Sequence, residues 1–264
     1  MAKLVGSFAA GHAPNVARLW DSMAIESRKW LTTHYDEMGR RLKDLDPDVL
    51  IIHSTDHWVN FFLDNIPAFC VGISEEHGGP PEPFMKPVFP HESLSGHPGL
   101  ASHILEFAFN ADFDPSFSMK LKLDHGMCVP VWRMDLNPMP AIIPVFMNLV
   151  EKPFPTPKRC LAWGHMLRDA IEAYPEDLRV VVLGTGGLSH SIGETTMGWV
   201  DEPFDLECIE LLNRLQMKNL LGILVRCSKR QVMGVQNCVP GLSLMRLPAA
   251  KGSILSVMLL CPIC

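Results

Sequence analysis

Short apolar runs alternate with segments of helical spacing along most of this chain. The clearest run is Val49–His53, which follows a helix-forming segment and the breaker Asp46-Pro47-Asp48. Continuous apolar runs of this kind are typical of strands that are buried on both faces of a parallel or mixed sheet. Strands that alternate with helices indicate an α/β fold. We therefore predict a single domain over residues 1–264, with a central mixed sheet flanked by helices on both faces.

The expected elements follow from apolar spacing and from the positions of Gly and Pro. Strands are predicted over residues 3–9, 49–53, 67–73, 141–149 and 178–184. Helices are predicted over residues 16–45, 98–108, 158–173 and 204–215. Residues 74–96 are rich in Gly, Pro and Glu, which predicts a long surface loop over a functional region. Pro144 lies inside a predicted strand and indicates an edge position or a bulge.

Histidines follow three of the predicted strands. His12 follows the first strand, His53 and His57 follow the second, and His190 follows the late strand. Ligands of α/β sheets bind at the carboxyl ends of the strands, so these imidazoles are expected to lie near one another. An imidazole can bind a metal ion, and it can also take and return a proton near neutral pH.

Each histidine also has a structural explanation, because a lone histidine in a loop is most often a surface residue. His12 has small neighbours that leave room around its ring. His53 is the last residue of an apolar run, so it is either a rival metal ligand or a buried core histidine. His125 is followed by Gly126, which permits an unusual backbone or the close approach of a substrate. These alternatives stay open on residue patterns alone.

Composition and motifs disfavour several other functions. The formal net charge is −6 and no basic stripe occurs in the first 210 residues, so nucleic acid is a poor candidate partner. The chain has no Gly-x-Ser-x-Gly elbow and no Walker A motif. No segment supplies the roughly 20 apolar residues of a membrane span, and the N-terminal apolar run is too short for a signal peptide. We expect a cytoplasmic protein whose eight cysteines are reduced thiols, many of them buried.

Several short motifs occur in one order over roughly residues 3–206. They include Gly11-His-Ala-Pro14, Asp56-His57, Asn65-Ile-Pro-Ala-Phe69, Gly96-His-Pro-Gly-Leu100, Leu123-Asp-His-Gly126, Tyr174-Pro-Glu-Asp-Leu178 and Gly184-Thr-Gly-Gly-Leu-Ser-His190. The ordered set resembles the class III extradiol dioxygenases, a family typified by the catalytic beta subunit of protocatechuate 4,5-dioxygenase. The resemblance implies an enzyme that opens the ring of a catechol-type aromatic with O₂ and non-haem Fe(II).

The resemblance also implies roles for individual residues. His12 and His57 match the two iron-binding histidines of the family. His190 matches the base that deprotonates the bound catechol, and His125 matches a second active-site histidine that contacts the substrate. The implied partners are the catechol, O₂ and further copies of this chain, together with a small lid subunit in some family members. The resemblance does not say which catechol is the substrate.

The C-terminal segment departs from the family pattern. The third iron ligand of the family is a late Glu, but this chain has no Asp or Glu after Glu210, whereas the same stretch holds seven Lys and Arg and four cysteines. Two explanations are open for residues 211–264. In the first, the segment has diverged, and a neutral ligand, a water, Glu207 or Glu210 replaces the carboxylate. In the second, the segment is out of frame or otherwise altered relative to related chains. We favour the second explanation. The missing Glu also favours a non-catalytic relative, similar to the Memo proteins of animals, as the alternative function; a metal-dependent hydrolase is a third hypothesis.

Overall fold

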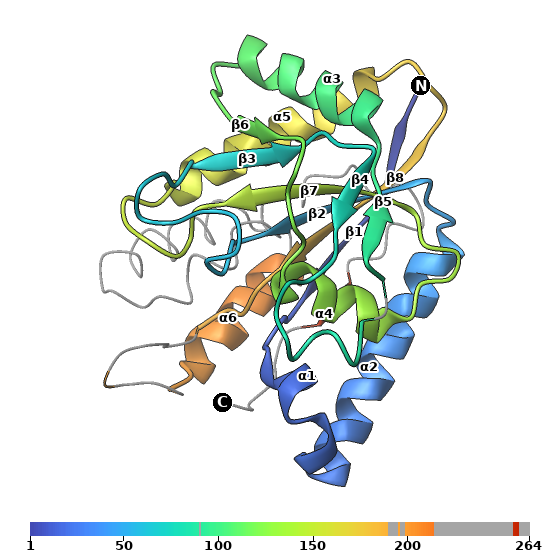
Figure 1. Cartoon of the computed structure of the whole chain (residues 1–264), viewed down its shortest axis with the longest axis vertical. Helices are drawn as coiled ribbons and strands as arrows, with labels where there is room; N and C mark the ends of the chain where they lie inside the picture. The colour runs from blue at the N-terminus through green and yellow to red at the C-terminus, as the bar shows by residue number, and fades with distance from the viewer. Residues whose placement is uncertain (90, 190–194, 196–198, 214–255, 259–264) are drawn as a thin grey trace.

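The computed structural model of the 264-residue chain describes all residues except 90, 190–194, 196–198, 214–255 and 259–264. Seven strands of the described part form one sheet in the order β6-β3-β7-β2-β8-β1-β9 (Figure 1). The strands are β1 (Lys3–Ala10), β2 (Val49–Ser54), β3 (Phe69–Gly72), β6 (Ser116–Ser118), β7 (Ala141–Met147), β8 (Arg179–Thr185) and β9 (Ser256–Met258). Neighbouring strands are parallel, except that β3 and β7 are antiparallel. The sheet is therefore mixed, as predicted.

Helices cover both faces of this sheet, which confirms the predicted fold class (Figure 1). The helices α3 (Pro98–Asn110), α5 (Pro157–Ala173) and α6 (Glu202–Asn213) pack against one face. The helices α1 (Asn15–Arg18), α2 (Ile25–Asp44) and α4 (His125–Met134) pack against the other. Along β2, Val49 and Ile51 join the first core, whereas Leu50 and Ile52 join the second. This double burial is why β2 is a continuous apolar run.

The predicted helix over residues 16–45 is wrong in its first part. The chain forms α1, a 3-10 turn at Trp20–Ser22, and then α2, which begins at Ile25. Met23 has an extended backbone and separates the turn from α2. Val16 in α1 and Leu31 in α2 are nevertheless buried in the same core cluster. Apolar spacing therefore continues across the break, and the spacing alone gives no sign of it.

Residues 74–96 were predicted to be a loop, and this prediction is wrong in part. They contain an antiparallel pair of short strands, β4 (Glu76–Gly78) and β5 (Ser93–Ser95). The sequence also gave no indication of β6 or of α4. Helix α4 contains Gly126 and Pro130, which have low helix propensity. Its residues from His125 to Val131 are buried, so tertiary packing rather than propensity accounts for this helix.

Pro144 lies in an internal strand, so the prediction of an edge position is wrong. Strand β7 lies between β3 and β2, but its pairing with β3 ends at Val145. Pro144 is paired with β2 through Ile52, and on the other side its ring packs against Gly72. A Cβ atom at Gly72 would lie 2.5 Å from Pro144 Cγ. The proline thus lies just beyond the β3 pairing, where its missing N–H does not interrupt that ladder.

Four of the eight cysteines lie in the described part of the chain. Cys70, Cys128, Cys160 and Cys208 are buried, and burial raises the pKa of Cys70 and of Cys160 to about 12. The other four cysteines lie outside the described residues.

Among the helices that the structure describes, none has both the length and the apolar character that crossing a membrane requires.

Candidate functional site

Three of the predicted histidines lie together at the carboxyl end of the parallel strands. His12 follows β1, His57 follows β2, and His125 is the first residue of α4. Their ring centroids are 4.9 Å apart for His12 and His57, 4.1 Å for His57 and His125, and 5.9 Å for His12 and His125. His190, the fourth predicted site residue, lies outside the described residues. We call the three described residues the histidine cluster.

Asp124 fixes the orientation of His57. Its Oδ2 atom accepts a hydrogen bond from the backbone N–H of His57 at 2.8 Å and another from Nδ1 at 3.0 Å. Burial opposes protonation of His57, but the charge and hydrogen bond of Asp124 outweigh it, with the charges of Asp56 and Glu82 in support, so the pKa of His57 is raised. Burial alone would raise the pKa of Asp124, but the charge of His57 and the hydrogen bonds from it outweigh burial, so the pKa of Asp124 is lowered. The carboxylate therefore leaves Nε2 as the ring nitrogen of His57 that can bind another group.

Glu82 holds His125 in the same way. Its Oε1 atom accepts hydrogen bonds from the backbone N–H of His125 at 3.1 Å and from Nδ1 at 2.8 Å. Both side chains are mostly buried. Glu82 belongs to the 74–96 segment that the sequence placed over a functional region, but no feature of the sequence distinguished it from Glu75 or Glu76. The same segment contributes Phe84, whose ring centroid lies 5.8 Å from that of His125.

His12 is positioned by two contacts from other elements. Its Nδ1 atom is hydrogen-bonded to Oγ1 of Thr185, the last residue of β8, at 3.0 Å. The hydroxyl of Tyr35 in α2 donates to the carbonyl oxygen of Gly11 at 2.7 Å and so fixes the backbone before His12. Thr185 belongs to the Gly184–His190 motif, but neither its contact with His12 nor the contact of Tyr35 was predicted. Both contacts join residues far apart in the chain, so no local pattern indicates them.

Gly126 makes room for the histidine cluster. A Cβ atom at this position would lie 2.6 Å from Ser54 Oγ, 2.8 Å from His57 Cε1 and 2.9 Å from Asp124 Oδ1. The sequence predicted that Gly126 permits an unusual backbone or the close approach of a substrate. In the structure the close neighbours are side chains of the site itself. Any larger residue at position 126 would displace His57 or Asp124.

His53 does not join the histidine cluster. It is fully buried, and its Nε2 atom accepts a hydrogen bond from Nε1 of Trp163 in α5 at 3.0 Å. Burial lowers the pKa of His53 to about 3, so the ring is neutral in the folded protein near pH 7. Of the two interpretations open for His53, the buried core histidine is the one that the geometry supports.

The residue before His190 is anchored to α6. The backbone N–H of Ser189 donates to Asp205 Oδ1 at 2.8 Å, and the backbone N–H of Asp201 donates to Ser189 Oγ at 2.7 Å. Burial raises the pKa of Asp205 to about 6. These bonds fix the backbone of Ser189, which immediately precedes His190 in the chain.

The histidine cluster can be tested for its fit to a metal ion. Within the part of the chain that the structure describes, no group of three or more His, Cys, Asp or Glu side chains is arranged to hold a metal. Glu207 and Glu210, the acidic residues considered as replacements for the late Glu, are exposed on α6. However, Asp124 Oδ1 and Glu82 Oε2 are buried without a hydrogen-bond partner among the described residues. Two imidazoles with engaged Nδ1 atoms, beside buried negative charge, fit a divalent cation.

Comparisons with known proteins match this chain to dioxygenases. Residues 6–239 match the family described as the catalytic LigB subunit of aromatic ring-opening dioxygenase. The chain is 30% identical over 168 residues to a 2,3-dihydroxyphenylpropionate/2,3-dihydroxicinnamic acid 1,2-dioxygenase of Photorhabdus laumondii, in an alignment that covers 63% of this chain and 50% of that protein. It is 35% identical over 122 residues to a gallate dioxygenase of Pseudomonas putida, which covers 45% of this chain and 36% of that protein.

The matched region spans half or less of the length of these two relatives. The fold itself is similar to that of an uncharacterized protein of Escherichia coli K12, with a TM-score of 0.51 and 14% sequence identity. That similarity covers 81% of this chain and 80% of the other. At this identity the solved structure supports the fold, and it carries no argument about activity.

Proposed function

The chain belongs to the family of catalytic LigB subunits of aromatic ring-opening dioxygenases, and from this premise we propose that it cleaves a catechol-type ring next to the diol with O₂ and non-haem Fe(II). The observation that supports the proposal best is the histidine cluster, in which three imidazoles lie within 5.9 Å of one another. Each ring is oriented by an oxygen of Thr185, Asp124 or Glu82. Such orientation is what a metal and proton-transfer site requires.

His12 and His57 would hold the metal ion. Their Nδ1 atoms are engaged with Thr185 and Asp124, so both would bind through Nε2. The buried carboxylate of Asp124 makes the His57 ring a better donor and offsets the charge of a divalent cation. Bound Fe(II) would supply Lewis acidity toward the catechol oxygens and redox contact with O₂.

His125 and His190 would move protons. Since ionised Glu82 can only accept hydrogen bonds, the Nδ1 atom of His125 carries a proton. The Nε2 atom of a neutral His125 is then the basic nitrogen, which can take a phenolic proton and return it later. His190 is proposed as the base that first deprotonates the catechol, on the basis of the family resemblance. The anchored Ser189 precedes it directly.

A second candidate is a metal-binding protein without ring-opening activity. The observation that favours it is the absence of any Asp or Glu after Glu210 in the sequence. His12 and His57 are the two proposed protein ligands, and an iron site of this chemistry usually has a third that is a carboxylate, whereas no metal-holding group of three or more His, Cys, Asp or Glu occurs among the described residues. This candidate predicts that iron binds but that catechol and O₂ are not consumed.

One experiment separates the two candidates. The protein is loaded anaerobically with Fe(II), bound iron is quantified, and O₂ uptake is then followed with protocatechuate, gallate and alkylcatechols. We expect one bound iron, O₂ uptake with at least one catechol, and loss of both in His57→Ala. His34→Ala, which changes an exposed histidine of α2, serves as the matched control. Iron binding without any O₂ uptake would contradict ring opening and support the second candidate.

A further inference from the structure

Strand β6 lies at an edge of the seven-stranded sheet, next to β3 (Figure 1). Within the described part of the chain, no strand pairs with its outer side. The carbonyl oxygen of Ser118 accepts the backbone N–H of Ile73 at 3.0 Å, so the backbone groups of Ser118 face β3. These groups alternate in direction along a strand, so the N–H and C=O of Phe117 face outward. An open edge of this kind is a template for pairing with another chain.

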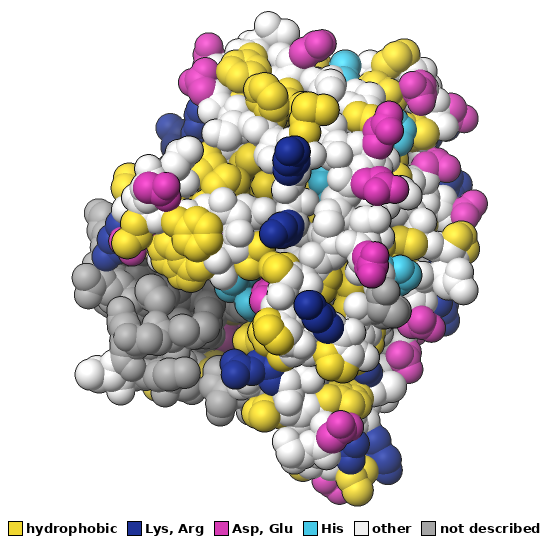
Figure 2. All heavy atoms as spheres, viewed as in Figure 1, with side chains coloured by type: hydrophobic (Ala, Val, Ile, Leu, Met, Phe, Trp, Pro, Cys, Tyr) yellow, Lys and Arg dark blue, Asp and Glu magenta, His cyan; other side chains and the backbone are white. Residues whose placement is uncertain are grey.

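Large apolar side chains are exposed at this edge. Phe117 is 57% exposed and Met119 is 65% exposed. The two residues are two positions apart, so their side chains lie on the same side of the strand. Figure 2 shows hydrophobic side chains on the surface where α3 and β6 lie.

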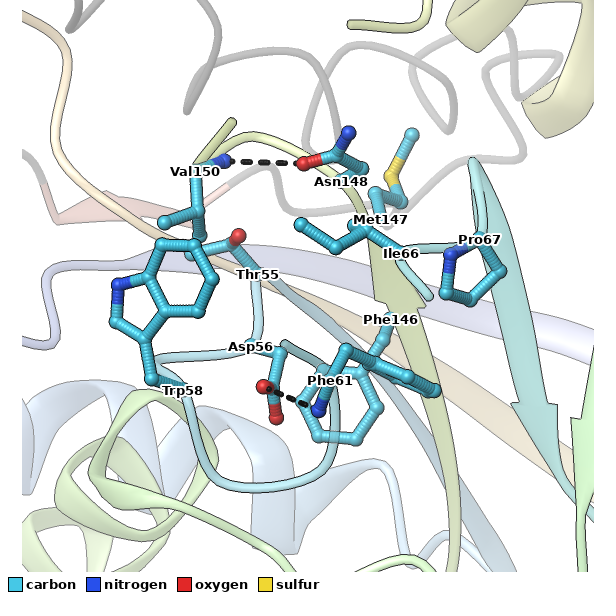
Figure 3. Close-up of a pocket in the computed structure, with 10 residues that line it drawn as sticks. All are labelled: Thr55, Asp56, Trp58, Phe61, Ile66, Pro67, Phe146, Met147, Asn148 and Val150. Carbon is cyan, nitrogen blue, oxygen red and sulfur yellow. Dashed lines mark hydrogen bonds between the residues drawn. The ribbon is translucent and has the colours of Figure 1, made fainter. Parts of the chain in front are cut away.

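A hollow at the loops after β2 and β7 is also lined by aromatic side chains, among them Trp58, Phe61 and Phe146 (Figure 3). It has room for about one water molecule, which is too little for a further ligand. Of these two apolar regions, the edge at β6 is therefore the one that is open to a partner.

Opposite charges lie symmetrically about Phe117. Asp114 is three residues before it, and Lys120 is three residues after it. Both side chains are exposed, and neither forms a salt bridge within the described part of the chain. An antiparallel pairing of two copies of β6 about Phe117 places Asp114 of each chain opposite Lys120 of the other. A parallel pairing in register would place like charges opposite each other, which is unfavourable.

We infer that the chain forms a homodimer in which two copies of β6 pair antiparallel about a two-fold axis at Phe117. Each Phe117 N–H donates to the C=O of the partner's Phe117, and the two sheets become one. The two phenyl rings then lie opposite each other, in a cross-strand pair that favours sheet pairing. The inference concerns assembly and does not depend on ring opening.

The residues on either side of Phe117 fit the same arrangement. The N–H of Met119 donates to the C=O of the partner's Pro115, and because proline has no N–H to donate, the ladder ends there. Lys120 alone would block an edge, but the partner's Asp114 supplies the opposite charge. A two-fold axis uses each edge once, so the assembly closes at two chains. A ladder this short gives a small interface, for which we expect Kd on the order of 10 μM.

Charge reversal tests both the partner and the register. Sedimentation velocity is measured for wild type, Lys120→Asp, Asp114→Lys and an equimolar mixture of the two variants, up to about 200 μM. Each variant alone has like charges at both ends of the ladder, so its Kd should rise about tenfold or more. In the mixture, the heterodimer has opposite charges at both ends, and dimers should return with a Kd close to the wild-type value. Lys29→Asp makes the same charge change at an exposed residue of α2 and should behave like wild type.

Recovery of dimers only in the mixture would support the antiparallel pairing, and it would also show that both variants are folded. A wild-type protein that stays monomeric at about 200 μM would overturn the inference. A dimer that tolerates both reversals would do so too, because it would use another surface. Two monomeric variants that do not associate when mixed would overturn the register, and weakening by Lys29→Asp as well would show a general charge effect in place of a specific pairing.

Discussion

Two carboxylates, those of Asp124 and Glu82, orient two of the three clustered histidines. Asp124 and Glu82 each accept two hydrogen bonds from one histidine, one from the backbone N–H and one from Nδ1. The pairing fixes both the tautomer and the direction of the ring, and each carboxylate retains one buried oxygen that has no hydrogen-bond partner within the described part of the chain. His57 and His125 therefore present Nε2 while their rings stay 4.1 Å apart.

Asp124→Asn should weaken metal binding. The amide oxygen can still accept from His57, but the negative charge that makes the ring a better donor is lost. Changes of this kind behind a metal-bound histidine typically reduce metal affinity about 10–100-fold. Anaerobic Fe(II) titration measures the effect, with Asp64→Asn as the control because Asp64 is exposed in the same loop as His57. An Fe(II) affinity equal to that of the wild type would show that Asp124 does not support a metal ligand.

Glu82→Ala should lower kcat about 10–100-fold while Fe(II) affinity stays close to the wild-type value, because Glu82 contacts His125 and not a proposed metal ligand. Glu82→Gln should recover part of this loss, since its side-chain oxygen can accept the same two hydrogen bonds. Steady-state kinetics with the best catechol, beside iron quantification, measure both variants. Glu92→Gln, an exposed residue of the same segment, is the control. A Glu82→Ala variant with wild-type kcat would remove Glu82 from the mechanism.

Elements with a repeating apolar pattern were predictable, whereas elements that depend on packing were not. Strand β2 is buried on both faces, so its sequence is apolar throughout, and His57 could be placed at its end. Helix α4 has Gly and Pro in its sequence and is stabilised by burial, so the sequence around His125 gave no helical signal. The break between α1 and α2 was missed because both helices bury their apolar residues in the same core.

The contacts that organise the site could not be predicted because they join distant parts of the chain. His57 and Asp124 are 67 positions apart, and Glu82 and His125 are 43 positions apart. A sequence pattern indicates which strand ends carry histidines, but it does not indicate which carboxylate will face each ring. Glu82 follows two prolines in a segment with several acidic residues, and only the three-dimensional arrangement distinguishes it.

Gly39→Ala should disturb the packing of α2 against α4. A Cβ atom at Gly39 would lie 2.2 Å from the carbonyl oxygen of Met134, which is a backbone atom and cannot rotate away. Alanine gains about 1 kcal/mol of helix propensity, but overpacking of this severity costs about 1–3 kcal/mol. We expect a net loss of stability in urea unfolding and, because α4 begins at His125, a lower kcat. Gly78→Ala, whose nearest neighbour would lie 3.6 Å away, is the control and should unfold like the wild type.

At the scale of the whole molecule, the sheet separates two cores, and the site lies at the edge where loops from both faces meet. His53 and Trp163 belong to the core between the sheet and α5, and His125 belongs to the face covered by α4. The fold class was predictable because strands and helices alternate in sequence. Homo-oligomer formation, a small lid subunit and the state of residues 211–264 stay predictions.

Acid should destabilise the protein partly through His53. Burial lowers the pKa of His53 to about 3, whereas the unfolded value is about 6.5, so below pH 6.5 the unfolded chain binds a proton that the folded chain does not. Stability is therefore highest above pH 6.5 and falls toward pH 3, with about 2 kcal/mol lost from this group by pH 5. Urea unfolding at pH 7.5 and pH 5 should show a smaller difference for His53→Gln than for wild type. If His53→Gln and wild type lost the same unfolding free energy between pH 7.5 and pH 5, this assignment would be contradicted. His34→Gln is the control and should behave like wild type.

Ring opening with O₂ can be identified from the isotopic mass of its product. Under ¹⁸O₂, the Fe(II)-loaded protein and its best catechol should yield a yellow ring-opened product with one labelled atom in its carboxylate and a second in its carbonyl group, and the second label is kept only if the carbonyl is reduced before it exchanges with water. His57→Ala and metal-free protein should yield none. Cleavage between the two hydroxyl groups, or no labelled product from iron-loaded protein, would contradict extradiol cleavage at the histidine cluster.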